Sequence, residues 1–123
     1  MRPHWISPTQ NSHGRPWGVY TILHETHMTK VKEIVVYYGQ RLSYQSHEHR
    51  DEHWFCIAGE GVILLDDIPI DFRKGEHVDI KRGQRHRIQC TSTEPLVFIE
   101  VQTGDSFAEE DIVRYTDDYG RSE

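Results

Sequence analysis

Residues 39–59 read GQRLSYQSHEHRDEHWFCIAG, a histidine-rich segment that begins and ends with glycine. Its two halves, about Leu42–His47 and His53–Ala58, have the composition and spacing of short strands that bury one face. Glycine at each end suits a turn, because turns often need a positive φ or a close backbone approach. The segment therefore predicts two consecutive short strands, with Trp54, Phe55 and Ile57 in the core.

Further runs rich in Val, Ile, Tyr and Phe recur between Gly, Pro and Asp residues along the rest of the chain. We expect strands at about Val19–Glu25, Val31–Tyr38, Val62–Leu65, Ile68–Phe72, His77–Ile80, His86–Cys90 and Leu96–Gln102. Short strands at this spacing predict an all-β protein, built as an antiparallel sandwich or a small barrel. A short helical turn is expected only near the C-terminus, over Phe107–Arg114.

Length and composition limit the possible classes of protein. The chain has 123 residues, 36% hydrophobic and 28% charged, which predicts one domain with a modest core. A formal net charge of −6 argues against a generally basic surface for nucleic acid. Most of that charge lies in residues 105–123, which hold seven acidic and two basic side chains. The rest is close to neutral, which suits an anionic ligand.

Location and assembly are also predicted from the sequence. No apolar run is long enough to span a bilayer, and residues 1–13 lack the apolar stretch of a signal peptide. Cys56 and Cys90 form neither a Cys-x-x-Cys pair nor a disulfide framework, so we expect a cytoplasmic protein with no membrane partner. A small antiparallel barrel exposes strand edges that a second subunit can cover, which predicts a homodimer.

Histidine is the most unusual feature of the composition, with nine residues, and several of them are clustered. Alternation places Gln45, His47 and His49 on one face of a predicted strand. Glu52 and His53 begin the next strand, and His86 lies on a later one. Imidazoles and a carboxylate that converge from separate strands are typical ligands of a divalent transition metal.

The spacing of this cluster resembles the two cupin motifs. Residues 39–59 match the first motif, with Gln45 in place of its first histidine. Residues 75–90 match the second, with Lys81 for the usual proline and Cys90 for the usual asparagine. The resemblance implies a small antiparallel jelly-roll barrel whose metal ligands are Gln45, His47, Glu52 and His86. A rival ligand set consists of His47, His49, His53 and His86, but it misses the motif spacing to both flanking glycines. His49 and His53 therefore remain alternate ligands.

Longer segments resemble the type II mannose-6-phosphate isomerase family, whose domain often forms the C-terminal part of a bifunctional mannose-1-phosphate guanylyltransferase. These segments are residues 15–18, 42–50, 52–54, 83–87, 99–104, 110–114 and 118–121. The resemblance implies an N-terminal extension over residues 1–14 and a cupin domain over residues 15–123. We expect this domain to stand alone, because nothing upstream could hold a nucleotide-binding domain.

The implied activity is the interconversion of mannose 6-phosphate and fructose 6-phosphate through a cis-enediol. A divalent metal would polarise the carbonyl; zinc is expected, with nickel, manganese and iron as alternatives. His49 is the expected base, with a role as a fifth ligand or as an orienting residue left open. Arg41 shares its strand parity and could offset enediolate charge or hold phosphate, or else be a solvated strand-end arginine.

The phosphorylated sugar would need further polar side chains. The resemblance matches Lys32 and Arg87 as phosphate ligands, although strict alternation places Arg87 on the face opposite His86. Glu100 and Gln102 share a face of one strand and could bind sugar hydroxyls, or be exposed if that face is the outer one. Two alternatives to the isomerase remain: a small iron-dependent cupin dioxygenase, and a non-catalytic sugar-binding cupin.

Overall fold

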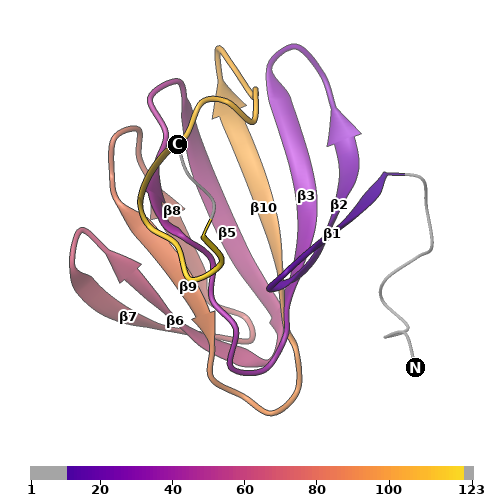
Figure 1. Cartoon of the computed structure of the whole chain (residues 1–123). Coiled ribbons are helices and arrows are strands. Elements are labelled where there is room, and N and C mark those ends of the chain that lie inside the picture. Colours follow the sequence, from indigo (N-terminus) through magenta and orange to yellow (C-terminus); the bar gives the residue numbers. More distant parts are fainter. Residues whose placement is uncertain (1–10, 121–123) are drawn as a thin grey trace.

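The computed structural model describes residues 11–120, which form two antiparallel sheets that face each other (Figure 1). One sheet has the strand order β1-β2-β3-β10-β5-β8, and the other has the order β11-β4-β9-β6-β7. The strands are β1 (Ser12–Arg15), β2 (Gly18–Glu25), β3 (Thr29–Val36), β4 (Tyr44–Ser46), β5 (Arg50–Ala58), β6 (Glu60–Leu65), β7 (Ile68–Arg73), β8 (His77–Ile80), β9 (His86–Cys90), β10 (Leu96–Gly104) and β11 (Val113–Thr116). The all-β prediction is therefore confirmed.

The expected helical turn over Phe107–Arg114 is wrong. Residues 105–112 form an irregular segment, and β11 then pairs with β4. The acidic side chains of this segment make contacts with distant residues. The Asp111 carboxylate accepts hydrogen bonds from the backbone N–H groups of Glu48 and His49, at 3.1 and 3.0 Å. These contacts hold the segment against the sheets, while its own backbone forms only short turns, such as the bond from the Asp111 N–H to the Ala108 carbonyl.

The structure describes no helix long and apolar enough to cross a membrane within residues 11–120. It also places residues 12–14, assigned above to an extension, within the sheet as part of β1. Residues 1–10 of the expected extension lie outside the described part of the chain.

Aromatic side chains fill the centre of the space between the sheets. Phe98 on β10 stacks on Trp54 of β5, with ring centroids 4.6 Å apart, and meets the edge of Phe72 from β7 at 5.7 Å. All three are buried. Phe55 and Ile57, also expected in the core, are exposed on the outer face of β5, because alternation with buried Trp54 and Cys56 turns them outward.

The inner face of the six-stranded sheet changes from apolar to polar along its strands. On β10 the buried side chains run from Leu96 and Phe98 to Glu100 and Gln102. The strand pairing sets Glu100 beside Lys32 of β3 and Gln102 beside Glu52 of β5. Buried charges of this kind are costly unless they pair or bind a ligand, so the polar end marks the part of the fold that can hold a site.

The turn between β5 and β6 packs closely against the backbone of Pro95, and substitution of Gly59 in this turn tests that packing. Gly59 has φ +77°, and a Cβ atom there would lie 2.4 Å from the carbonyl oxygen of Pro95. Gly39 has φ +75°, but its Cβ would meet nothing within 4 Å. Gly59→Ala is therefore expected to lower the free energy of unfolding by about 3 kcal/mol, and Gly39→Ala by only about 1 kcal/mol. Urea denaturation measures both values, and equal losses would contradict the close approach at Gly59.

Candidate metal centre

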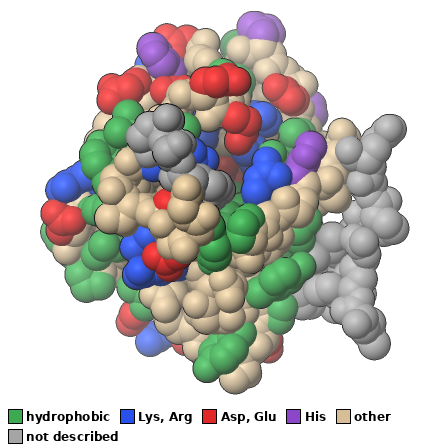
Figure 2. Space-filling view, in the orientation of Figure 1, with side chains coloured by type: hydrophobic (Ala, Val, Ile, Leu, Met, Phe, Trp, Pro, Cys, Tyr) green, Lys and Arg blue, Asp and Glu red, His purple; other side chains and the backbone are tan. Residues whose placement is uncertain are grey.

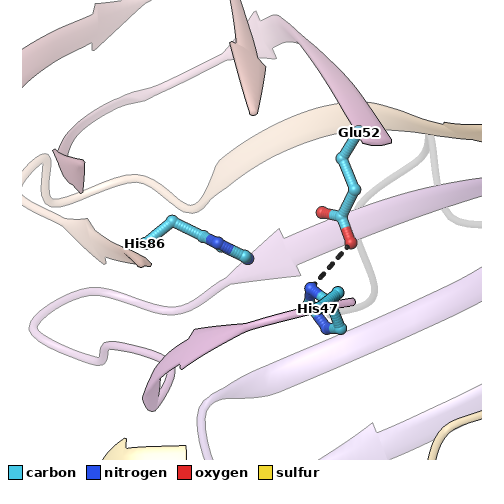
Figure 3. A group of neighbouring side chains, drawn as sticks. All are labelled: His47, Glu52 and His86. Atoms are coloured by element: carbon cyan, nitrogen blue, oxygen red, sulfur yellow. Dashed lines mark ion pairs between the residues drawn. The ribbon is translucent and has the colours of Figure 1, made fainter. Parts of the chain in front are cut away.

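His47, Glu52 and His86 converge from three different parts of the fold (Figure 3). His47 directly follows β4, Glu52 lies on β5, and His86 is the first residue of β9. One potential ligand atom from each residue lies within 4.8 Å of those of the other two. All three residues are buried, at 5%, 2% and 3% exposure, so the cluster is shielded from bulk water.

Hydrogen bonds orient two members of this cluster. His86 Nδ1 lies 3.1 Å from the carbonyl oxygen of Gln84. A carbonyl can only accept, so Nδ1 carries the proton and Nε2 keeps the lone pair that a metal needs. The indole N–H of Trp54 donates to Glu52 Oε1 at 2.9 Å. Contacts of this kind fix ligand orientation in metal sites.

Arg50 bridges the other side of the cluster and was missed by the sequence predictions. Its Nη2 group donates to His47 Nε2 at 2.8 Å, and its Nε group donates to Glu52 Oε2 at 2.9 Å. The residue is only 6% exposed, and its buried Nη1 atom has no hydrogen-bond partner among the described residues. Strand alternation could have revealed this residue, because Arg50 and Trp54 share the inward face of β5 with Glu52.

The charge state of the cluster suits a cation. Burial lowers the pKa of His47 to about 3, and burial also lowers the pKa of His86, so both imidazoles are neutral at neutral pH. Burial opposes ionisation of Glu52, but the Arg50 guanidinium and the Trp54 N–H stabilise its carboxylate and hold the pKa of this carboxyl below its usual range. Neutral imidazoles beside an ionised carboxylate suit a metal. His47 Nε2 already accepts from Arg50, so a metal bound at either nitrogen of His47 requires the Arg50 side chain to move.

The donor set fits a divalent transition metal. Such an ion binds imidazole nitrogen and carboxylate oxygen at about 2.0–2.2 Å, so two ligand atoms of a tetrahedral site lie about 3.4 Å apart. His47 Nδ1 and Glu52 Oε2 already lie 3.4 Å apart, and the overall limit of 4.8 Å means that the side chains close around the ion when it binds. Gln45 lines the same cavity, and its β4 position pairs directly with His86, so its amide oxygen is a further potential ligand.

A cavity of about 190 Å³ opens beside the cluster. Its walls combine apolar, aromatic and charged side chains: Arg15, Trp17, Tyr20, Lys32, Ile34, Leu42, Ser43, Gln45, His47, Arg50, Glu52, Trp54, His86, Glu100, Glu109, Ile112 and Arg114. Figure 2 shows basic and acidic side chains next to one another around a hollow on this face of the molecule. Of the residues predicted for the site, the structure therefore brings Gln45, His47, Glu52, His86, Lys32 and Glu100 together.

His49 and His53 are not part of this cavity. The prediction for His49 assumed that strand alternation continues past His47, but β4 ends at Ser46 and the chain bends over residues 48–49. The His49 side chain is 58% exposed and lies 3.7 Å from Asp105. His53 lies on the outer face of β5, where its Nδ1 atom is 2.8 Å from Asp79. The structure therefore does not assemble the rival ligand set.

Arg41 and Arg87 also lie outside the cavity lining. Arg41 forms two hydrogen bonds with the Asp118 carboxylate, at 2.6 and 2.9 Å, in a partly exposed pair. Arg87 donates to the backbone carbonyls of Leu42 and Thr116, at 2.8 and 3.4 Å. Alternation from His86 turns Arg87 to the other face of β9, and its contacts hold the C-terminal segment in place.

Glu100 gives the cavity a pH-sensitive carboxyl group. Burial, followed by the charge of Glu52, raises the pKa of Glu100 from 4.5 to about 8. A raised folded-state pKa contributes stability that is complete below pH 4.5 and lost as pH rises through 8. The native metal-free protein should therefore lose stability between pH 5 and pH 9, and Glu100→Gln should remove this loss. The difference in stability between the variant and the native protein should then shift in favour of the variant by at least about 1 kcal/mol from pH 5 to pH 9, or roughly 4 °C in Tm. Thermal unfolding at both pH values measures the difference; an equal change in the exposed control Glu94→Gln would contradict it.

Comparison with known sequences identifies related proteins. The family described as "Mannose-6-phosphate isomerase C-terminal" matches residues 6–117. The xanthan biosynthesis protein XanB of Xanthomonas campestris is 38% identical over 108 residues, which cover 88% of this chain and 23% of that protein. A mannose-1-phosphate guanylyltransferase of Escherichia coli is 39% identical over 108 residues, which cover 87% of this chain and 22% of that protein. The chain thus spans less than a quarter of the length of these relatives.

Comparison with solved structures independently shows the fold. The capsular polysaccharide assembling protein CapF of Staphylococcus aureus superposes with a TM-score of 0.77 at 21% identity, over 90% of this chain and 32% of CapF. A double-stranded β-helix protein of Klebsiella pneumoniae superposes with a TM-score of 0.71 at 20% identity, over 89% of this chain and 90% of that protein. The chain belongs to the mannose-6-phosphate isomerase C-terminal family and has the cupin fold.

Proposed function

We propose that the chain is a metal-dependent sugar-phosphate isomerase domain that interconverts mannose 6-phosphate and fructose 6-phosphate through a cis-enediol. The carrying observation is the buried His47–Glu52–His86 cluster in the wall of a cavity that also contains buried cationic side chains. Membership of the isomerase family supports the choice of reaction.

His47, Glu52 and His86 would hold the metal, with Gln45 as a fourth ligand. A bound divalent ion, zinc or else nickel, manganese or iron, supplies polarisation of the sugar carbonyl and stabilisation of enediolate charge. Arg50 replaces Arg41 as the arginine that offsets negative charge, because Arg50 is buried in the cavity wall and Arg41 is paired outside it. The apolar walls at Ile34, Leu42 and Trp54 limit the water that surrounds the reacting carbons.

Glu100 replaces His49 as the proposed base. Its carboxyl lines the cavity, whereas the His49 side chain is exposed beside Asp105. The isomerisation needs one group that takes a proton from one carbon of the sugar and returns it to the neighbouring carbon. A carboxyl whose pKa burial raises to about 8 is a stronger base than an ordinary carboxylate, and enough of it is ionised near neutral pH to accept that proton.

Turnover of fructose 6-phosphate in heavy water tests the proposal. Protein loaded separately with Zn²⁺, Ni²⁺, Mn²⁺ or Fe²⁺ is expected to produce mannose 6-phosphate with deuterium at C2, because the base exchanges the proton it took from C1 with solvent before it protonates C2. Metal-free protein and a His86→Ala variant purified in the same way serve as controls for contaminating isomerase. Proton NMR detects the label, and no turnover with any of the four metals would reject the proposal.

The same samples separate the two alternative functions. Oxygen consumption by the Fe²⁺-loaded protein, without isomerisation, would instead support the dioxygenase. Thermal stabilisation by mannose 6-phosphate without any turnover would support a sugar-binding protein, since a ligand that binds only the folded state raises Tm.

A further inference from the structure

Two lysines of β3 direct their ammonium groups at a single carboxylate. Lys30 and Lys32 lie two residues apart on the inner face of the strand, and their side chains are only 9% and 7% exposed. The Oε2 atom of Glu109 lies 3.1 Å from Lys32 Nζ and 3.6 Å from Lys30 Nζ. The second distance exceeds the usual length of an N–H···O hydrogen bond. One carboxylate therefore faces two buried positive charges and satisfies only one of them closely.

Arg50 adds a third cation to this environment. It lines the same cavity as Lys32 and Glu109, and its buried Nη1 atom has no hydrogen-bond partner among the described residues. Burial opposes ionisation of Glu109, but Lys32, Lys30 and Arg50 outweigh it and lower the pKa of that carboxyl. Arg50 is also paired with Glu52 at 2.9 Å, so the three cations face two carboxylates and one positive charge stays unmatched. An unmatched buried cation and an unused buried donor suit an anion-binding site before its ligand arrives.

Glu109 can leave this position without disrupting the sheets. It belongs to the irregular segment 105–112 between β10 and β11, and its side chain is 55% exposed although its carboxylate reaches the lysines. In Figure 1 this C-terminal part of the chain, drawn in yellow, passes in front of the two sheets. Glu109 is itself half exposed, but the two lysines are more than nine-tenths buried, so its departure leaves two buried cations that an incoming anion must pair.

We propose that Lys30, Lys32 and Arg50 form the subsite for the phosphate of the ligand, and that Glu109 occupies this subsite in the ligand-free protein. A phosphate monoester carries about −1.5 to −2 charges at neutral pH and offers three acceptor oxygens. It therefore matches three cations better than one carboxylate does, and it displaces Glu109 on binding. Only the identification of the ligand as a sugar phosphate rests on the proposed function.

Glu109→Gln tests the occupancy directly. If the Glu109 carboxylate competes for the site, phosphate can bind only those molecules in which the site is open. The apparent affinity for phosphate is then the intrinsic affinity multiplied by that open fraction. Isothermal titration at constant ionic strength is expected to show inorganic phosphate and mannose 6-phosphate binding about tenfold more tightly to Glu109→Gln than to the native protein. Glu110→Gln changes net charge equally from an exposed neighbouring position, and should bind as the native protein does. Equal affinity in the two variants, or weaker binding to Glu109→Gln, would overturn the proposal.

Lys30→Met and Lys32→Met test the subsite itself. Each is expected to weaken inorganic phosphate binding at least about tenfold, since each removes a buried cation from the site. Thermal unfolding of each variant shows whether it is folded. If a lysine variant is not folded, the phosphate affinity of Glu109→Gln tests the subsite instead. Phosphate binding at native affinity by folded Lys30→Met would reject the subsite.

These binding measurements separate the subsite from the proposed isomerase activity. Tighter phosphate binding by Glu109→Gln without any isomerisation supports the subsite and rejects only the reaction. Isomerisation with unchanged phosphate binding in both lysine variants rejects the subsite and leaves the reaction supported.

Discussion

Replacing His86 with alanine is expected to abolish stoichiometric binding of Zn²⁺. His86 supplies one of three donors whose ligand atoms lie within 4.8 Å, and its Nδ1–H bond to Gln84 directs the Nε2 lone pair to the ion. Changing a residue that only orients a ligand weakens metal binding 10–100-fold, so losing the ligand itself should cost more than about 100-fold. Isothermal titration and metal analysis after dialysis measure the affinity and the stoichiometry.

His53→Ala is the matched control for this experiment. It removes the same kind of side chain from β5, in the facing sheet, but His53 contacts Asp79 on the outer face of that strand. Zn²⁺ affinity and stoichiometry should therefore stay at the native values. Loss of binding in His53→Ala, together with retention in His86→Ala, would place the metal on the outer face and contradict the account.

Replacing Phe98 with alanine is expected to have the largest effect on stability. The Phe98 ring is fully buried between Trp54 and Phe72, with centroids 4.6 and 5.7 Å away. Its removal leaves a cavity and costs about 3–5 kcal/mol, a large part of the 5–15 kcal/mol typical of a small domain. The same change loosens Trp54, whose indole N–H orients Glu52, so Zn²⁺ affinity should also fall. Urea denaturation and titration measure the two effects.

Phe55→Ala provides the comparison. Phe55 follows Trp54 on β5 but faces outward with 45% of its surface exposed. We expect it to lower the free energy of unfolding by less than about 1 kcal/mol and to leave metal binding unchanged. Equal losses for Phe98→Ala and Phe55→Ala would show that the core does not lie between the two sheets as described.

The strands were predicted well where burial controls the pattern. His77–Ile80 and His86–Cys90 were predicted with the observed bounds, because apolar side chains face the core and turn residues flank each run. The strands β1 and β11 were missed, since each has four mostly polar residues at a sheet edge. Their formation depends on pairing with β2 and β4, which alternation in their own sequences does not reveal.

The site was predictable to the extent that it follows motif spacing. Gln45, His47, Glu52 and His86 line one cavity, as the cupin spacing implies. The prediction that His49 shares the face of His47 was wrong, because it assumed a continuous strand and β4 ends three residues before His49.

Residues outside the motif spacing were not predictable in this way. Arg50 interacts with two members of the cluster through side-chain hydrogen bonds that spacing does not encode. Glu109 reaches Lys32 across 77 positions of sequence, from a segment for which a helical turn was expected. Only the folded chain shows these contacts.

A crystal structure of the Zn²⁺-loaded protein, with anomalous scattering recorded at the zinc edge, tests the metal centre most directly. The account predicts one strong peak at about 2.0–2.2 Å from a nitrogen of His47, a nitrogen of His86 and an oxygen of Glu52, with Gln45 nearby. No peak in this cavity, or a peak held instead by His49 or by His53 and Asp79, would contradict it.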